Sequence, residues 1–319
     1  MTKKTIILII LSLIFLGLCS LFGAMNFGVK EIFANSDARD VWLNMRLPRI
    51  VLGFLAGGGL SLAGMSFQSV FRNPLAEPYT LGISSGATLG CVACTVLGVE
   101  IIGFATVPVF AFLGAVLSVT IVYFLAGRGR KFGVAEMLLA GIGVNFFFSA
   151  FVLLLEYFGK EYNLAKIMHW TMGGLEIVGF SKILEILPFC LVGIYFIFRN
   201  TKELNLLSLG EETAITRGVD TKKVKKHIFF GASLMIGSLC AVCGPIAFVG
   251  MICPHIMRMI FGWDTGRLGP ACFVFGGVFL VLCDTLGRCI ISPAELPVGI
   301  ITSLLGGPFF IYLLCRKKV

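Results

Sequence analysis

The stretch FATVPVFAFLGAVLSVTIVYFLA, at residues 104–126, contains no charged residue. A helix of about 20 mostly apolar residues is long enough to cross the hydrocarbon core of a bilayer. Similar apolar stretches lie at 6–22, 50–70, 79–98, 134–155, 181–198, 228–245, 246–261, 270–290 and 297–315. The sequence therefore predicts an all-α polytopic membrane protein with about ten transmembrane helices, which span length and short connections allow in a chain of this size.

The composition of the whole chain favours the same environment. Of its 319 residues, 57% are hydrophobic and 13% are charged, whereas a soluble domain carries about 25% charged residues. A water-soluble fold of this size has too little interior to bury so much apolar surface. The composition excludes a disordered protein, a nucleic-acid-binding domain and an ordinary cytosolic enzyme. Because apolar stretches fill the chain, residues 1–319 are predicted to form a single transmembrane domain.

The positive charges are distributed unevenly between the connections. If the N-terminus is cytoplasmic and the spans alternate, the basic residues left on the outside are Lys30, Arg39, Arg46, Arg49, Lys160, Lys166, Lys182 and Arg288. The rest of the 26 Lys and Arg residues, including the basic runs at 128–131 and 222–226, lie inside. Cytoplasmic connections of membrane proteins are enriched in Lys and Arg. The charge pattern therefore predicts that both termini are cytoplasmic, and it accounts for the net charge of +9 without nucleic acid.

Sequence motifs for catalysis and for metal binding are absent. The chain has no phosphate loop of the Gly-x-x-x-x-Gly-Lys-Ser/Thr type, no His-Glu-x-x-His and no Gly-x-Ser-x-Gly. Its two Cys-x-x-Cys pairs, at 91–94 and 240–243, lie in apolar stretches, which favours packing over metal binding. Asp284 is the main candidate for a coupling-ion ligand, but Arg288 follows it on the same helical face and can pair with it. We expect no catalytic residue and no metal ligand.

One inside connection, residues 204–220, differs from the others in length and pattern. Ser208 and Glu211 have the spacing of a capping box, and Gly218 is suited to end a helix in a left-handed conformation. The spacing predicts one short amphipathic helix on the cytoplasmic side. Such a helix can lie on lipid or dock onto a partner protein, and the acidic pair Glu211 and Glu212 disfavours an anionic lipid surface.

An ordered set of motifs then identifies a family. The motifs are MRLPR at 45–49, RNPLAEP at 72–78 followed by LGISSGA at 81–87, LLAGI at 138–142, HWTMGG at 169–174, the segment 204–219, GPIAFVG at 244–250 with Pro254-His255, PAELPVG at 293–299 and GGPFF at 306–310. In this order the chain, from about residue 42 to its C-terminus, resembles the membrane subunits of the ATP-binding-cassette (ABC) importers for iron–siderophore complexes, haem and cobalamin.

The resemblance implies a permease of the cytoplasmic membrane that moves a metal chelate by alternating access. It implies a homodimer, or a heterodimer with a related permease, driven by two cytoplasmic ATPase subunits and supplied by an extracytoplasmic binding protein. ATP and Mg²⁺ would be bound by the ATPase subunits, so no cofactor is expected in this chain. The resemblance leaves the chelate open. The alternative is an ion-coupled secondary transporter, which needs ion ligands at mid-membrane depth.

The resemblance also implies three groups of site residues. The coupling segment matches the family's pattern at Leu209, Gly210, Glu211, Ala214 and Gly218 but departs from it at Arg217, where an apolar residue is more usual. The translocation pathway is expected beside the fifth span, at Gly141, Asn145 and Ser149. For Asn145 the alternative is an ordinary interhelical hydrogen bond.

The third group is a proposed docking patch for the binding protein, at Arg46, Arg49 and Arg288. These charges oppose the positive-inside bias, so topology does not account for them. Pro48 would stiffen the chain between the first two, and an arginine fork suits the carboxylates of an acidic partner. The alternative is that the arginines anchor the helices at the membrane interface.

Overall fold

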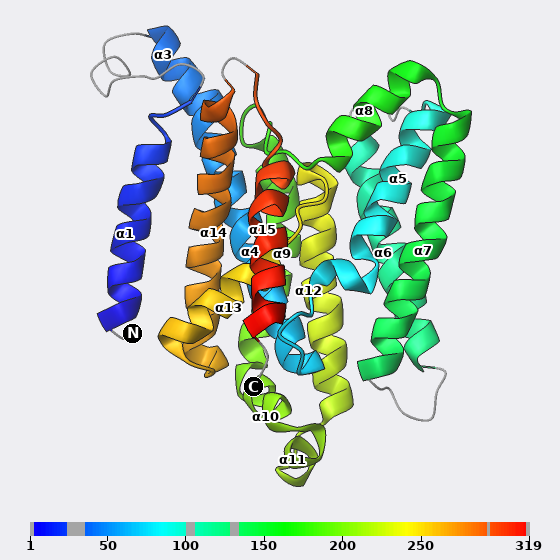
Figure 1. Ribbon diagram of the computed structural model, residues 1–319, viewed down its shortest axis with the longest axis vertical. Helices are drawn as coiled ribbons and strands as arrows, with labels where there is room; N and C mark the ends of the chain where they lie inside the picture. The colour runs from blue at the N-terminus through cyan, green and yellow to red at the C-terminus, as the bar shows by residue number, and fades with distance from the viewer. Residues whose placement is uncertain (1–2, 24–35, 100–105, 128–133, 292–293, 317–319) are drawn as a thin grey trace.

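The computed structural model describes residues 3–23, 36–99, 106–127, 134–291 and 294–316, and these residues form helices and connections without a strand (Figure 1). Three features of the sequence, Lys30, the basic run 128–131 and Pro293, lie outside the described residues. The long helices are α1 (Lys3–Cys19), α4 (Leu47–Phe71), α5 (Ile83–Leu97), α6 (Thr106–Gly127), α7 (Val134–Phe158), α9 (Ser181–Arg199), α12 (Thr221–Cys243), α13 (Val249–Phe261), α14 (Thr265–Ile290) and α15 (Val298–Arg316).

Short helical elements connect them. They are α3 (Ser36–Val41), a π-helix (Trp42–Arg46), a 3₁₀-helix (Pro78–Leu81), α8 (Glu161–Thr171), α10 (Thr201–Leu209) and α11 (Glu211–Thr216). Among the described residues, six helices are long and apolar enough to cross a membrane: the continuous helix Ser36–Phe71, α6, α7, α9, α12 and α14. The helices α1, α5, α13 and α15 are apolar but shorter. The all-α membrane class is confirmed, whereas the count of ten spans stays a prediction.

The segment before the second span differs from expectation. The sequence suggests a polar connection as far as Arg46, but residues 36–46 are helical and continue directly into α4. Extending an existing helix adds one hydrogen bond per residue without a new nucleation step. Ala38, which is buried, also packs this extension onto the protein. Polarity alone therefore marks where a helix leaves the apolar region and not where it ends.

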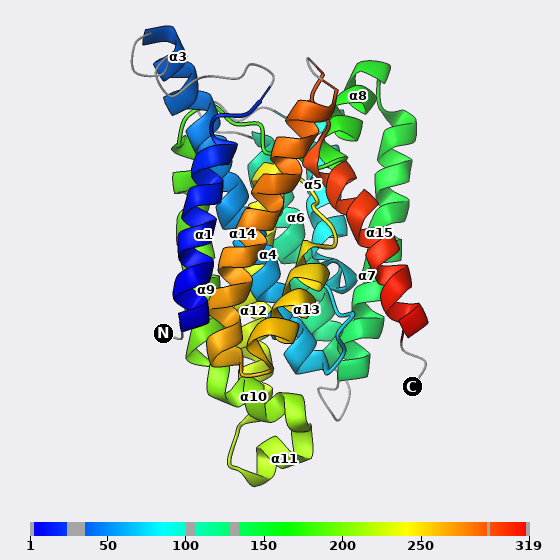
Figure 2. The ribbon, with the colours of Figure 1, turned by 60° about the vertical axis from the view of Figure 1, so that its left-hand side comes forward.

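The core lies around α4, which runs through the middle of the bundle beside α12 and α14 (Figures 1 and 2). In the most apolar part of the helix 36–71, 83% of the residues are buried, against 17% in α7. Glycine permits the close packing: a Cβ atom on Gly57 would lie 2.2 Å from the carbonyl oxygen of Gly276 in α14. The thiols of Cys91, Cys94, Cys240 and Cys243 are buried and form no disulfide, as expected of packing residues.

The two ends of the bundle carry different short helices. The helices α3 and α8 lie at one end, named here the outer end, and α10 and α11 lie at the other, the inner end (Figures 1 and 2). The helix α1 begins, and α15 ends, toward the inner end. The half-length helices α5 and α13 occupy opposite halves of the bundle. The names of the ends follow the predicted topology.

Candidate functional site

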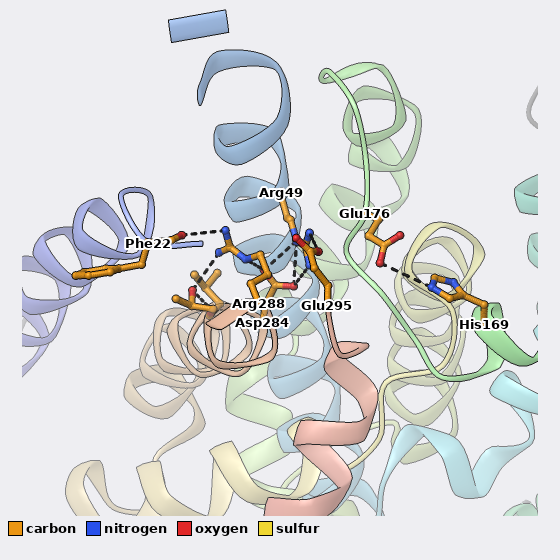
Figure 3. Close-up of polar contacts among 9 residues, drawn as sticks. Phe22, Arg49, His169, Glu176, Asp284, Arg288 and Glu295 are labelled. Atoms are coloured by element: carbon orange, nitrogen blue, oxygen red, sulfur yellow. Dashed lines mark hydrogen bonds and ion pairs between the residues drawn. The ribbon is translucent and has the colours of Figure 1, made fainter. Parts of the chain in front are cut away.

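At the outer end, five charged side chains from the π-helix before α4, from α4, from α14 and from the connection to α15 form the outer cluster, and four of them are labelled in Figure 3. They are Arg46, Arg49, Asp284, Arg288 and Glu295. The guanidinium of Arg49 holds Asp284 in a fork, with Nε and Nη2 donating to the two carboxylate oxygens at 2.8–3.1 Å. Its Nη1 donates to Oε2 of Glu295 at 2.6 Å. One arginine therefore binds two carboxylates, as its planar fork allows.

The other two arginines secure the end of α1. Arg288 lies 3.0 Å from Asp284, which confirms the pairing expected between these neighbours on one helix face. Its Nη1 also donates to the carbonyl oxygen of Phe22 at 3.2 Å. Arg46 donates to the carbonyl oxygens of Leu21 and Ser20 at 2.9 and 3.3 Å. These bonds satisfy carbonyl groups that the helix end leaves without a partner in α1.

The three arginines of the expected docking patch are largely buried. Arg46 and Arg288 are 7% and 3% exposed, and the side chain of Arg49 is 13% exposed. A guanidinium removed from water to this extent needs nearby acceptors. Asp284 and Glu295 provide opposite charge, which is why these positive residues are tolerated at the outer end.

A hollow of about 640 Å³ opens over the outer cluster. Besides residues of the cluster, it is lined by Glu176, Ile177, Val178 and Lys182, which belong to the connection before α9 and to its first turn. Glu176 lies 3.9 Å from Nε2 of His169, and both side chains are largely exposed (Figure 3). The hollow therefore has both signs of charge on its wall, and the outer cluster forms its floor.

The expected pathway residues are brought together only in part. Asn145 and Ser149 of α7 line a hollow of about 380 Å³ with Tyr79, Ser84, Ser85, Thr88, Val152 and Leu153. Gly141 does not line it, because Gly141 is buried and its carbonyl lies against Gly82. Phe147, on the opposite side of α7 from Asn145, is 60% exposed. The two faces of α7 are thus distinct: one turns hydroxyl and amide groups to a hollow, and the other turns apolar side chains outward.

At the inner end, the chain forms two short helices, α10 and α11, where the sequence predicted one. Ser208 lies in the last turn of α10, where its hydroxyl donates to the carbonyl oxygen of Asn205 at 2.7 Å, so Ser208 is not a cap. The chain turns at Gly210, with φ of 144°, and α11 begins at Glu211. Gly218 has φ of 80°, in the left-handed conformation expected. The capping-box prediction is wrong because Glu211 has a different partner.

That partner is Lys225 in the first turns of α12. Its Nζ donates to Glu211 at 2.6 Å, and the hydroxyl of Thr221 donates to the same oxygen at 3.1 Å. The Lys225 side chain is 1% exposed, so it is not simply one charge of a solvated basic run. Burial favours the neutral form of Glu211, but the hydrogen bond and charge of Lys225 outweigh it, so the pKa of Glu211 lies below its usual range.

The coupling segment turns one apolar face inward and leaves another uncovered. Ala214 is fully buried against the bundle. Leu209 and Ile215 are 71% and 55% exposed. They flank the turn at Gly210 and lie in the two helices that form the inner extremity of the protein (Figure 1). An exposed apolar tip of this kind suits a protein surface with a complementary groove.

Sequence reasoning missed the position of Glu77. Its carboxylate accepts a hydrogen bond from the backbone N–H of Phe248, which joins the connection after α4 to the break before α13. Phe248 has φ of 68°, an uncommon conformation for a bulky residue. The RNPLAEP motif contains Glu77, but nothing local in that motif points to Phe248. Only the fold brings the two connections together.

The model of the FecCD transport family matches residues 5–316. The chain belongs to this family. It is 36% identical to the hemin transport system permease protein HmuU of Yersinia pestis, covering 98% of this chain and 95% of the relative. It is 38% identical to the cobalamin import system permease protein BtuC of Halobacterium salinarum, covering 92% and 77%. It is 33% identical to the iron(3+)-hydroxamate import system permease protein FhuG of Bacillus subtilis, covering 99% of each.

The fold also matches a solved structure. A metal-chelate type ABC transporter in an inward-facing conformation superposes with a TM-score of 0.90 at 28% identity, covering 98% of this chain and 99% of that one. The family resemblance inferred from the motifs is therefore confirmed. The chain is a multi-pass membrane permease of an ABC importer for metal chelates, a transport component and not an enzyme.

Proposed function

We propose that this permease carries an iron–siderophore complex, haem or cobalamin across the cytoplasmic membrane by alternating access. The observation that carries the proposal is a difference between the two ends. Charged groups line a hollow at the outer end, and an apolar tip projects at the inner end. Relatives named for hemin, ferric hydroxamate and cobalamin support the class of cargo. The termini are proposed to be cytoplasmic, with about ten spans.

The proposed coupling site is the tip formed by Leu209 and Ile215, with Gly210 and Gly218 shaping its turns. It would dock onto one of two cytoplasmic ATPase subunits, which would bind ATP and Mg²⁺. Glu211 and Ala214 would not contact the ATPase but would join the tip to the rest of the permease, because Glu211 is paired with Lys225 and Ala214 is buried. Movement of the ATPase would then reach α12 through the Glu211–Lys225 ion pair. No cofactor is proposed for this chain itself.

The proposed docking site for an extracytoplasmic binding protein is the outer hollow, with Arg46, Arg49 and Arg288 beneath it. Of the three, Arg49 has the guanidinium that contacts the partly exposed carboxylate of Glu295. Charge pairs at a rim mainly set association rate and salt dependence. Acidic residues on the binding protein would therefore approach Arg49 and the neighbouring Lys182.

The proposed pathway lies along the hydroxyl-rich face of α7, at Asn145 and Ser149. The rest of the α7 surface exposes Leu139, Phe146 and Phe147 by 60–73%. A second permease subunit, identical or closely related, is proposed to cover part of this surface, and lipid the rest. Gly141 would contribute by letting α7 approach the turn at Gly82.

The outer cluster disfavours an ion-coupled secondary transporter. Asp284 is the acid that such a mechanism would use, yet it already faces both Arg49 and Arg288 within 3.0 Å. Its carboxylate oxygens are already occupied by two guanidiniums, so they are not available to ligate a coupling ion. The ATP-driven mechanism needs no such group in this chain.

Uptake by reconstituted vesicles tests the proposal. The chain is co-expressed with candidate ATPase subunits and binding proteins, and vesicles are loaded with ATP and offered hemin, a ferric hydroxamate or cobalamin. We expect uptake of one cargo that requires ATP and a binding protein and that persists when ion gradients are collapsed. Leu209→Asp combined with Ile215→Asp should abolish ATP-dependent uptake, whereas Glu212→Ala, a matched control in the same segment, should not. Uptake driven by an ion gradient without ATP would contradict the proposal.

A further inference from the structure

The two carboxylates on Arg49 differ in where they come from and how exposed they are. Asp284 belongs to α14, is 3% exposed and is shared with Arg288. Glu295 belongs to the connection between α14 and α15, and its side chain is 31% exposed. A partly exposed ion pair contributes little net free energy, whereas breaking a buried one is costly. Glu295 is therefore the exchangeable ligand of Arg49, and Asp284 is the permanent one.

We propose that Glu295 is an internal stand-in for a carboxylate of the binding protein, which displaces it from Arg49 on docking. This inference rests on the proposed docking function and deepens it. An incoming carboxylate gives the guanidinium the same planar pairing that Glu295 gives it in the free permease. The exchange leaves Arg49 fully paired throughout, so docking does not require an arginine to be stripped of its charge partner.

Displacement of Glu295 has a structural consequence because of where Glu295 lies. The next residue, Leu296, donates its N–H to the carbonyl oxygen of Gly287 at 3.1 Å, and α15 begins at Val298. The first turn of α15 is packed against the connection before α9, where the N–H of Gly299 reaches the carbonyl oxygen of Gly173 at 3.3 Å. Release of Glu295 would remove a side-chain contact that holds the segment before α15, while these two backbone hydrogen bonds would remain.

The start of α15 also borders a hollow of about 470 Å³. Gly299, Ile300, Ser303 and Leu304 of α15 line this hollow with Tyr79, Thr171, Met172, Pro245 and Ala247. The ion pair between Arg49 and Glu295 thus lies between the surface where a binding protein would dock and the helix that lines this second hollow. Docking of the binding protein, by exchange of the carboxylate on Arg49, would therefore change the contacts at the start of α15.

Glu176 is the matched control. It lines the same outer hollow and its side chain is 50% exposed, but the side chain beside it is His169, at 3.9 Å, and not an arginine of the outer cluster. Glu295→Ala and Glu176→Ala each remove one negative charge from the hollow. Glu295→Ala also removes a ligand of Arg49. A difference in affinity for the binding protein between the two variants therefore measures how far Glu295 competes for Arg49, beyond the effect of removing one negative charge.

The experiment measures the affinity of the purified transporter for the binding protein that supports uptake in the vesicle assay. Glu295→Ala should raise this affinity about tenfold, and Glu176→Ala about twofold, because the latter changes only the field at the rim. In an Arg49→Gln background the gain from Glu295→Ala should fall to that of Glu176→Ala. Equal gains for both variants with Arg49 intact would overturn the stand-in role.

A distance measurement gives a second readout. Spin labels at Ile291 and Val178, both exposed, report on the connection before α15 and on the facing rim. Their separation should shift when the binding protein is added, and Glu295→Ala should reproduce part of that shift without it. An unchanged separation in both cases overturns the inference. If Arg49→Gln leaves the association rate and its salt dependence unchanged, the docking function itself fails, which is a separate result.

Discussion

Both ends of the bundle bury a cation, but they leave different surfaces to a partner. At the outer end Arg49 binds Asp284 and Glu295, so its charge is already matched within the chain. At the inner end Lys225 binds Glu211, while Leu209 and Ile215 project uncovered beyond that pair. A partner at the outer end has to compete with the permease's own carboxylates. A partner at the inner end meets an apolar surface that no described part of the chain covers.

The largest expected effect concerns the outer end, where Asp284 is removed from the outer cluster. Asp284→Ala leaves two buried guanidiniums without their common carboxylate, which should cost about 3–5 kcal/mol of stability. The midpoint of thermal unfolding in detergent should fall clearly. Glu295→Ala, which removes the exposed ligand of Arg49, should change that midpoint far less. A similar loss for both variants would show that the two carboxylates are not the unequal pair described above.

The next effect concerns the inner side. Gly218→Val places a β-branched residue at φ of 80°, a strain of about 1–3 kcal/mol. Among the described residues, no atom beyond Gly218 and its two chain neighbours lies within 4 Å of the position a Cβ would take, so the cause is backbone conformation and not a clash. We expect cargo-stimulated ATP hydrolysis to fall at least about tenfold while the permease stays folded in the membrane. Gly218→Asn, which tolerates the left-handed region, should retain most of the stimulation.

A labelling experiment places the pathway relative to the two ends. In a background without reactive native cysteines, Asn145→Cys should react with a water-soluble thiol reagent in at least one transport state, because Asn145 lines a hollow. Phe147→Cys, about 200° around the same helix from Asn145, should stay unreactive where lipid or a second subunit covers it. Inertness of the Asn145→Cys variant in every state would contradict the pathway assignment.

The smallest expected effect is a pH dependence at the inner end. The pKa of Glu211 is lowered in the folded protein, so its pairing with Lys225 stabilises the fold above the unfolded pKa, near 4.3, and is lost as pH falls through the lower folded value. Because Glu211 is partly exposed, we expect at most about 1 kcal/mol. Wild type and Glu211→Gln should therefore lose stability with different slopes below about pH 4.5, as measured by thermal unfolding.

The sequence predicted some features of the site because their causes are local. The pairing of Asp284 with Arg288 follows from helical spacing. The left-handed turn at Gly218 follows from residue type. The predicted cap at Ser208 failed for the opposite reason: Glu211 is bound by Lys225, a residue in the next helix, and no local rule anticipates that competition.

The sequence by itself determined the class of the protein and its family. Long apolar stretches can be stable only as helices in lipid, since each then satisfies its own backbone hydrogen bonds. The ordered motifs carried the family resemblance. The tertiary structure alone decided that Arg49 faces Glu295, that Glu77 caps the break at Phe248, and that Leu209 stays exposed while Ala214 is buried. Each of these depends on where helices distant in sequence meet, which is fixed by packing of the whole bundle and not by any short stretch of the chain.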